Sequence, residues 1–287
     1  MNDFPKTSPL LEQSGPFSPK NLMERWETLS RNLEDRMPRM PLLLPDLLLL
    51  SRSGTGRTQF LKLLTDFLLA HPNLMDFSGG APYLEFRLNY CAPAAEFTEF
   101  TRFLSEMRHT AGFRGEFRGI VYLDIDEWAD RFEEKHFVTF LEYLADNSDD
   151  WLLIFSVTDS ITSPQQLSRL QAFLASCLRL EKVVLPVPTA KDLLRFAEQQ
   201  LLSYRFTLSE EAKTVLLGSL GLLCESPYFD GYKSARLLCR DIVYVVCSTP
   251  DAVPGPLSGD DLRPFAPQSE YMQKMLVKLQ AKRTIGF

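Results

Sequence analysis

The amino-acid sequence predicts an α/β protein, in which a parallel β-sheet covered by helices is followed by a smaller all-helical domain. Two observations support this prediction. Up to about residue 185, short apolar segments alternate with amphipathic helical segments, and several apolar segments have no polar face, as expected for strands buried on both sides of a parallel sheet. From Pro186 on, only helical patterns remain. We therefore expect a domain boundary near residue 186.

The first 41 residues are expected to form an N-terminal tail and a linker helix. Residues 1–17 contain three prolines among serine, threonine and glycine, and Ser18-Pro19 is a typical helix start. Four apolar residues then share one helical face: Leu22, Trp26, Leu29 and Leu33. We interpret this face as core packing, with a partner helix or the cover of a bound adenine as the alternatives.

The parallel sheet and its helices are expected within residues 42–186. The predicted strands span 46–50, 83–90, 119–127, 151–157 and 182–185. The predicted helices between them run from about 58 to 67, 96 to 108, 132 to 144 and 165 to 178. Each pair of successive strands is thus separated by a segment long enough for the crossover that parallel pairing requires.

The helical domain is expected within residues 187–265. Thr189 is a good N-cap for its first helix, and Ser209 opens a second helix that ends near Gly218 to Gly221. A third helix is expected from about 232 to 247. A proline-rich loop and a short last helix complete the domain.

Composition favours a soluble, cytoplasmic protein. The chain has 287 residues and 45% hydrophobic residues, which is ordinary for a globular protein. Its net charge of −6 disfavours non-specific nucleic-acid binding. We find neither a signal-peptide pattern nor an apolar run of about 18 residues, so a membrane is not expected to be a partner. The five cysteines form no C-x-x-C pair and are expected to be reduced thiols.

Residues 51–58, Ser-Arg-Ser-Gly-Thr-Gly-Arg-Thr, have the order of a phosphate-binding loop. A strand precedes them and a helix follows, so backbone N–H groups and the positive end of the helix dipole can converge on an anion. The usual pattern is G-x-x-x-x-G-K-[ST]. Gly56 and Thr58 fit it, whereas Ser51 replaces the first glycine and Arg57 the lysine. The residues expected to bind the phosphates of a nucleotide are Ser53, Gly54, Thr55, Gly56, Arg57 and Thr58.

A second motif, Asp124-Ile125-Asp126-Glu127, follows four apolar residues about 65 positions after the loop. In P-loop enzymes, a carboxylate at the end of a neighbouring strand holds Mg²⁺ beside the hydroxyl residue of the loop. A following glutamate can polarise the attacking water. We therefore expect Asp126 and Thr58 to hold Mg²⁺ and Glu127 to act as the base. The alternative is a set of surface carboxylates at a strand end.

Thr158 ends the next apolar strand. Parallel sheets bind ligands beyond the carboxyl ends of their strands. Thr158 is therefore placed to hydrogen-bond the γ-phosphate of a nucleotide or the lytic water.

Over about residues 42–265, these elements resemble the AAA+ family of P-loop ATPases. The likeness is nearest to the branch that holds the sporulation stage V K protein and the red-type rubisco activase, because Ser234-Ala235-Arg236 lies on a late helix and Leu257–Leu262 follows it. The resemblance implies a P-loop NTPase domain followed by a helical lid, with ATP and Mg²⁺ as cofactors.

The same resemblance assigns further roles. It implies a degenerate Walker A motif at 51–58, a Walker B motif at 122–127 and the sensor-one position at Thr158. It also implies that Arg236, as sensor two, reaches the γ-phosphate from the lid. The arginine finger, which acts in the neighbouring subunit of a homo-oligomeric ring, would be Arg179 or, as the second choice, Arg169.

Three functions follow as hypotheses. The first is a slow Mg²⁺-dependent ATPase that assembles into a ring and remodels a protein partner. The second is a non-catalytic scaffold or regulatory subunit, favoured by Ser51, by Arg57 and by residues 89–95, which lack the aromatic-apolar-glycine pore loop of threading family members. The third is a DNA-directed protein such as a loader or a transposition helper, which the acidic balance and the lack of a basic, aromatic-laced stripe argue against.

The C-terminal residues 266–287 are expected to form a short basic amphipathic helix. Its apolar residues are Tyr271, Met272, Met275, Leu276 and Leu279. Its basic residues are Lys274, Lys278, Lys282 and Arg283. We expect this helix to pack on the lid or on a neighbouring subunit, since its apolar face is short for membrane contact.

Overall fold

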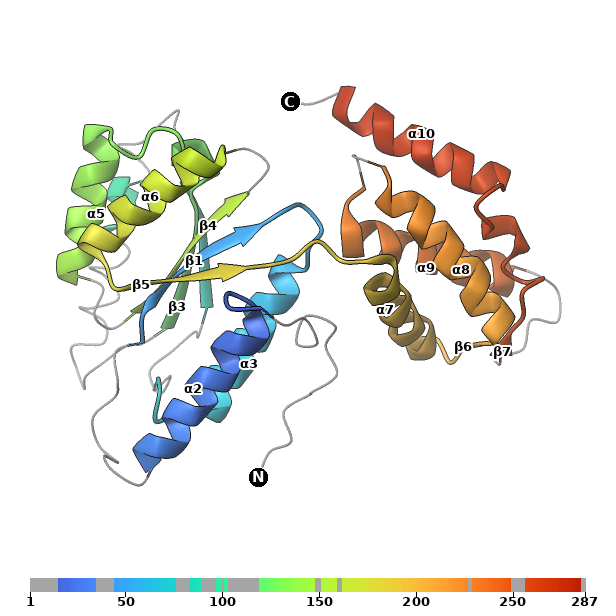
Figure 1. Cartoon of the computed structure of the whole chain (residues 1–287), viewed down its shortest axis with the longest axis horizontal. Helices are drawn as coiled ribbons and strands as arrows, with labels where there is room; N and C mark the ends of the chain where they lie inside the picture. The colour runs from blue at the N-terminus through green and yellow to red at the C-terminus, as the bar shows by residue number, and fades with distance from the viewer. Residues whose placement is uncertain are drawn as a thin grey trace. The chain divides into compact units, whose positions relative to one another are not determined.

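Figure 1 shows the computed structural model of the chain, which describes residues 15–34, 44–75, 83–88, 97–99, 101–102, 119–147, 151–158, 162–226, 229–248 and 256–284. The chain divides into two compact units. The first ends at Leu185, and the second begins at Pro186 and also includes Ser53–Gly56.

The first unit is built on a five-stranded parallel sheet with the strand order β2-β3-β4-β1-β5. The strands are β1 (Asp46–Ser51), β2 (Tyr83–Arg87), β3 (Gly119–Asp124), β4 (Trp151–Thr158) and β5 (Leu180–Val184). This sheet confirms the predicted α/β class. Because β4 lies between β1 and β3, its end pairs with both: Ser51 is opposite Thr158, and Asp124 is opposite Ser156.

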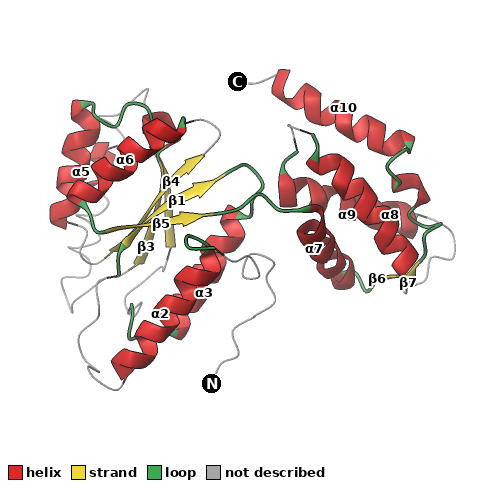
Figure 2. Ribbon diagram, viewed as in Figure 1, coloured by secondary structure: helices red, strands yellow, loops and turns green. Residues whose placement is uncertain are grey.

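Helices cover both faces of the sheet (Figure 2). The helices α2 (Pro19–Glu34) and α3 (Arg57–Ala70) lie on one face, and α5 (Lys135–Asn147) and α6 (Pro164–Cys177) lie on the other. Helix α2 buries Leu22 and Trp26, and the Ser30 hydroxyl donates a hydrogen bond to Oδ1 of Asn73, just after α3, at 2.8 Å. The apolar face of α2 therefore packs within its own chain, which confirms the core interpretation.

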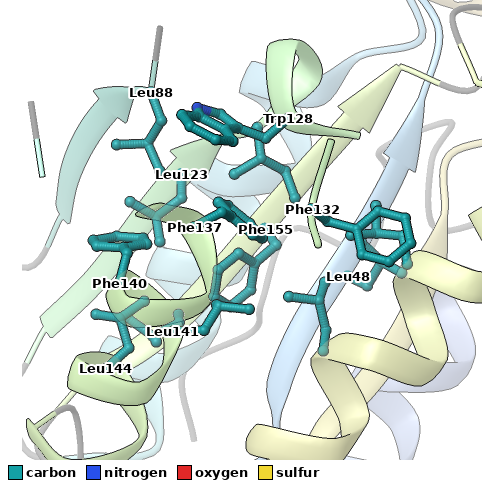
Figure 3. Packing of buried hydrophobic residues seen from close by; sticks show 14 of the residues in the cluster. Leu48, Leu88, Leu123, Trp128, Phe132, Phe137, Phe140, Leu141, Leu144 and Phe155 are labelled. Atoms are coloured by element: carbon teal, nitrogen blue, oxygen red, sulfur yellow. The ribbon is translucent and has the colours of Figure 1, made fainter. Parts of the chain in front are cut away.

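The core between the sheet and α5 and α6 is rich in aromatic rings (Figure 3). Trp128 stacks on Phe137 with ring centroids 5.4 Å apart, and Phe97 stacks on Phe140 at 4.5 Å. Alternate side chains of the central strands point into this core: Leu48, Leu50, Val121, Leu123, Phe155 and Val157. The intervening residues, among them Tyr122 and Ser156, therefore face α3, on the other side of the sheet.

Strand β3 ends at Asp124, three residues earlier than predicted. Ile125 leaves the extended conformation with φ −114° and ψ 23°, and Asp126–Trp128 form the short 3₁₀ helix η1. The N–H of Ile125 still donates to the Ser156 carbonyl at 3.1 Å, and its side chain is fully buried in the core. Ile125 is thus buried although it lies beyond the strand, and for this reason the sequence pattern makes the strand look longer than it is.

Other boundaries also differ from the predictions. Helix α5 begins at Lys135 rather than near 132, because residues 129–134 form turns. Strand β2 ends at Arg87, and residues 89–90 of its predicted extent lie outside the described residues, as do the tail 1–14 and the pore-loop segment 89–95. Of the helix expected over 96–108, the described residues 97–99 and 101–102 are helical.

The second unit is helical, as predicted. It contains α7 (Ala190–Ser203), α8 (Glu210–Cys224), α9 (Gly231–Cys247), the 3₁₀ helix η2 (Arg263–Phe265) and α10 (Glu270–Thr284). The caps predicted for α7 and α8 are present: the Thr189 side chain accepts from the Asp192 N–H, and the Ser209 side chain accepts from the Ala212 N–H. A two-residue parallel pairing of β6 (Thr207–Leu208) with β7 (Pro256–Leu257) was not predicted.

Helix α8 does not end at the glycines, but continues to Cys224. A Cβ at Gly218 would lie 3.2 Å from Cγ of Pro267, so this glycine allows the chain after η2 to approach the helix closely. The hydroxyl of Ser219 donates to the Phe265 carbonyl at 2.6 Å. Packing against the segment around η2 therefore outweighs the low helix propensity of the glycines.

The first turns of α10 pack on the helical unit, as expected. Met272 is fully buried, the Tyr271 ring meets Phe265 edge-on, and the Tyr271 hydroxyl donates to Asp241 on α9. The side chains of Lys282 and Arg283 lie outside the described residues. Among the helices that the structure describes, none combines the length and the apolar character needed to cross a membrane.

Asp46, at the amino end of β1 between β4 and β5, gives a pH-dependent prediction. Its carboxylate accepts a hydrogen bond from the Leu153 N–H at 2.9 Å, and burial raises its pKa from 3.8 to about 7. Between these pH values the folded protein binds a proton that the unfolded chain has lost, so the free energy of unfolding should fall by roughly 1.4 kcal/mol per pH unit as the pH rises.

Asp46→Asn keeps the oxygen acceptor and cannot ionise. Urea unfolding at pH 5 and pH 7.5 should show a shallower loss of stability for this variant than for the unsubstituted protein. Equal losses for the two proteins would show that Asp46 does not titrate in this range.

Candidate functional site

The turn that follows β1 contains two glycines in a backbone conformation that favours glycine. Gly54 and Gly56 have φ values of +75° and +94°, a region in which other residues are strained. Ser51 differs, because it is the last residue of β1 and is buried in extended conformation opposite Thr158. The position of Ser51 therefore does not require a glycine, and this departure from the usual pattern costs no backbone strain.

Arg57 is the first residue of α3, and its guanidinium reaches the ends of β3 and β4. Its Nη1 donates to the Ser156 hydroxyl at 3.3 Å and lies 3.9 Å from Oδ2 of Asp124. The guanidinium carbon lies 5.5 Å from the centre of the Tyr122 ring, within the range of a cation–π contact. Three residues on the α3 face of the sheet thus hold this arginine.

The environment of these residues is partly buried and charged. Burial and the nearby Asp126 carboxylate raise the pKa of Asp124, while the Asp126 N–H, which donates to Oδ1 of Asp124, and the Arg57 cation act in the opposite direction. Burial also raises the pKa of the Tyr122 phenol well above its usual range. Arg57, together with Arg87, thus offsets a strand-end carboxylate in a region of limited solvent access.

Asp126 is held by Thr158. Oδ1 of Asp126 accepts from the Thr158 backbone N–H at 2.6 Å, and Oδ2 accepts from the Thr158 hydroxyl at 2.7 Å. The predicted metal ligand and the predicted sensor-one residue are thus brought together, and both carboxylate oxygens accept from a single residue. Charge-assisted pairs of this kind fix the orientation of the carboxylate.

We expect Thr158→Val to lower the free energy of unfolding by about 1–2 kcal/mol. This substitution removes the hydroxyl donor to Asp126 and keeps the size and branching of the side chain, so the carboxylate loses one charge-assisted bond. Chemical denaturation measures the loss. Thr158→Ser, which keeps the hydroxyl, should recover most of the stability, and an equal loss in both variants would contradict a role for the bond.

Glu127 and Thr58 are adjacent in sequence to residues of this site. Oε1 of Glu127, in η1, accepts from Nη2 of Arg87 at the end of β2, at 3.3 Å. Thr58 is the second residue of α3 and its side chain is exposed. In the part of the chain that the structure describes, no group of three or more histidine, cysteine or acidic residues is placed to hold a metal ion.

The predicted arginine residues lie on other parts of the two units. Arg179 precedes β5, and its carbonyl accepts from the Asp46 N–H at 2.8 Å, which places it at the amino edge of the sheet. Arg169, on α6, donates to Glu133 at 2.6 Å. Arg236, on α9 of the second unit, is exposed, and its guanidinium lies 5.9 Å from the Phe196 ring.

The start of α3 has the electrostatic character of an anion-binding helix N-terminus. Helix α3 has 14 residues, begins with a cation and carries no acidic residue in its first turn, so its positive dipole end is not neutralised from within. Mg²⁺ bound together with nucleotide phosphates needs only one or two protein carboxylates. Asp124 and Asp126 meet that requirement, although no larger acidic cluster is present among the described residues.

The sequence does not single out Ser156, and it places Tyr122 and Asp124 within the 122–127 motif without giving either a role of its own. Tyr122 has the appearance of one more apolar strand residue, and Ser156 falls inside an apolar run. Their positions follow from alternation along β3 and β4 together with the pairing of Asp124 with Ser156. Alternation could have placed Tyr122 and Asp124 on one face, but the pairing of β3 with β4 is not visible in the sequence.

Comparisons with known proteins bear on the fold. No protein-family model and no curated protein matches the chain. Solved structures do match. The Thermotoga maritima RuvB Holliday junction branch migration motor has a TM-score of 0.53 at 10% identity, with 96% of this chain and 81% of that chain covered.

Two further structures match over most of this chain. PCH-2 from C. elegans has a TM-score of 0.51 at 11% identity, with 93% of this chain and 69% of that chain covered. Hsp104 in a closed state with ATPγS and casein has a TM-score of 0.51 at 13% identity, with 97% of this chain but only 46% of that chain covered. At these identities the likeness shows the fold alone, which is an α/β fold with a five-stranded parallel sheet followed by helices.

Proposed function

We propose that this protein binds ATP with Mg²⁺ at residues 53–58 and hydrolyses it slowly. The observation that best supports this proposal is the position of Arg57. It begins α3 immediately after the Gly54–Gly56 turn, and its side chain meets Asp124 at the carboxyl edge of the sheet. A phosphate-binding turn, a helix N-terminus, a cation and strand-end carboxylates thus converge at one edge, as parallel α/β folds arrange them for nucleotides.

Each residue has a proposed role. The N–H groups of the loop and the Arg57 guanidinium bind the phosphates, and Thr58 with Asp126 holds the metal, assisted by Asp124. When bound, ATP with Mg²⁺ supplies the phosphoryl group that is transferred to water. Glu127 accepts the proton of that water. Thr158 orients Asp126 and contacts the γ-phosphate or the water.

The remaining roles concern assembly. We propose a cytoplasmic homo-oligomeric ring, in which Arg236 contacts the γ-phosphate within its own subunit and Arg179, or Arg169 as the second choice, acts on the neighbouring subunit. The likeness in fold to Hsp104 and RuvB, together with the resemblance of the motifs to AAA+ ATPases, supports this proposal. The net charge of −6 favours a protein over DNA as the remodelled partner.

Slow turnover follows from the contacts of the reacting groups. Arg57 is planar and forked where the usual lysine is a compact point charge, so the phosphates meet a different donor geometry. The proposed base Glu127 accepts from Arg87 and Asp126 accepts twice from Thr158, so both carboxylates already have partners. Hydrolysis requires at least the Glu127–Arg87 contact to open.

The hydrolysis claim predicts that Glu127→Gln lowers phosphate release from ATP by about 100-fold, since a positioned general base contributes rate factors of this order. Steady-state phosphate release by the purified protein with Mg²⁺ measures this. Glu142→Gln, an exposed glutamate on α5, is the matched control and should leave the rate unchanged. Equal rates for the unsubstituted protein and Glu127→Gln would refute hydrolysis at this site.

A non-catalytic scaffold or regulatory subunit is the second candidate. The bonds that occupy Glu127 and Asp126 favour it, because they also stabilise the fold without nucleotide. Isothermal titration separates the candidates. Micromolar binding of ATP with Mg²⁺, together with phosphate release above the Glu127→Gln level, supports the ATPase. Binding without turnover, or no binding, supports the scaffold.

A further inference from the structure

The contacts of Arg57 indicate that groups of the protein and a bound phosphate would compete for its guanidinium. One nitrogen, Nη1, donates to Ser156 and also faces Oδ2 of Asp124, while the guanidinium lies over Tyr122. The Arg57 side chain is 37% exposed and that of Asp124 is 18% exposed, so the ion pair is only partly screened by water. The arginine therefore has a defined binding position inside the protein.

Moving Arg57 away from this position has a cost. Asp124 lies beside Asp126, whose N–H donates to it, and the Arg57 cation offsets the repulsion between the two carboxylates. The Ser156 hydroxyl, fully buried at the end of β4, would also lose the Arg57 donor. The guanidinium is a rigid plane, so turning it toward a phosphate would break the contacts that its Nη1 makes with Ser156 and Asp124.

We propose that Asp124 and Ser156 are positioning residues that hold Arg57 in the nucleotide-free protein and compete with the nucleotide phosphates for it. This inference rests on the proposed function and concerns the regulation of the same site. It makes ATP affinity depend on two residues that need not touch the nucleotide.

The test is isothermal titration with ATP in EDTA, where no metal can involve Asp124. We expect Asp124→Asn to tighten ATP binding about fivefold. Ser156→Ala changes no charge and should tighten it about two- to threefold, because each substitution removes one competitor for Arg57. Glu85→Gln is the electrostatic control: it removes an exposed carboxylate on β2 that lies opposite Tyr122 in the sheet and has no role in the proposed site, and it should change the affinity by less than twofold.

The outcomes are distinct. A gain in both Asp124→Asn and Ser156→Ala, with little change in Glu85→Gln, supports the competition. Equal gains in Asp124→Asn and Glu85→Gln with none in Ser156→Ala would show general charge repulsion and overturn it. If Asp124→Asn does not fold, Ser156→Ala decides the question. If ATP binds with Mg²⁺ but Ser156→Ala gains nothing in EDTA, this inference alone fails, whereas no binding by any variant in either condition removes the proposed function too.

Discussion

Arg57→Ala is expected to weaken the binding of ATP with Mg²⁺ by about 100-fold. Charge-assisted hydrogen bonds contribute about 1.5–3 kcal/mol each, and the loss of one or two of them between the guanidinium and the phosphates corresponds to this factor. The variant also leaves Asp124 without its cation, which increases the repulsion of the triphosphate. Isothermal titration of both proteins under one salt condition measures the change.

Two further variants separate the contact from general charge. Arg57→Lys keeps the cation, restores the usual residue of the loop and should bind ATP at least as tightly as the unsubstituted protein. Arg52→Ala removes an exposed cation from the same loop and should weaken binding by less than threefold. If Arg52→Ala and Arg57→Ala cause equal losses, the loop attracts ATP through its net charge and Arg57 has no specific role.

Phe137→Ala is expected to lower the free energy of unfolding of the first unit by about 3–5 kcal/mol, the usual range for a fully buried phenylalanine. Phe137 is 0% exposed and stacks on Trp128, and its ring centroid lies 6.3 Å from that of Phe140. Removing the ring leaves a cavity among rigid neighbours that cannot easily collapse into it. Urea unfolding followed by tryptophan fluorescence measures the loss.

Phe137→Leu retains most of the apolar volume and should lose about half as much stability or less. Tyr244→Ala, on an α9 side chain that is 74% exposed, should change stability by less than about 0.5 kcal/mol. A loss below about 1 kcal/mol for Phe137→Ala would mean that this aromatic cluster does not anchor the sheet to α5.

Most of the fold can be predicted from local sequence patterns. The apolar segments that become β1 and β4 are buried on both sides of the sheet, and their sequences show this directly. The caps Thr189 and Ser209 are short-range signals and predict two helix starts of the second unit. The end of β3 could not be predicted because Ile125 is buried although it lies beyond the strand. The extent of α8 could not be predicted because it depends on the close packing of Gly218 against Pro267.

The site is less accessible from the sequence. The loop could be predicted because its signal is local: Gly54 and Gly56 stand directly between a strand pattern and a helix pattern. The partners of Arg57 could not, because Ser156 is 99 positions away and meets it only through the insertion of β4 between β1 and β3. The contact of Asp126 with Thr158 depends on the same strand order, so the sequence predicts both residues but not their bond.

The most direct test of the central claim is a structure of the protein with a non-hydrolysable ATP analogue and Mg²⁺. We expect the phosphates on the N–H groups of residues 53–58, Arg57 within hydrogen-bond distance of a phosphate oxygen, and the metal beside Thr58 and the carboxylates of Asp124 and Asp126. Arg57 released from Ser156 would accord with the competition described above. A nucleotide bound elsewhere, or an Arg57 that stays on Asp124 and Ser156 while the analogue is bound, would contradict the account.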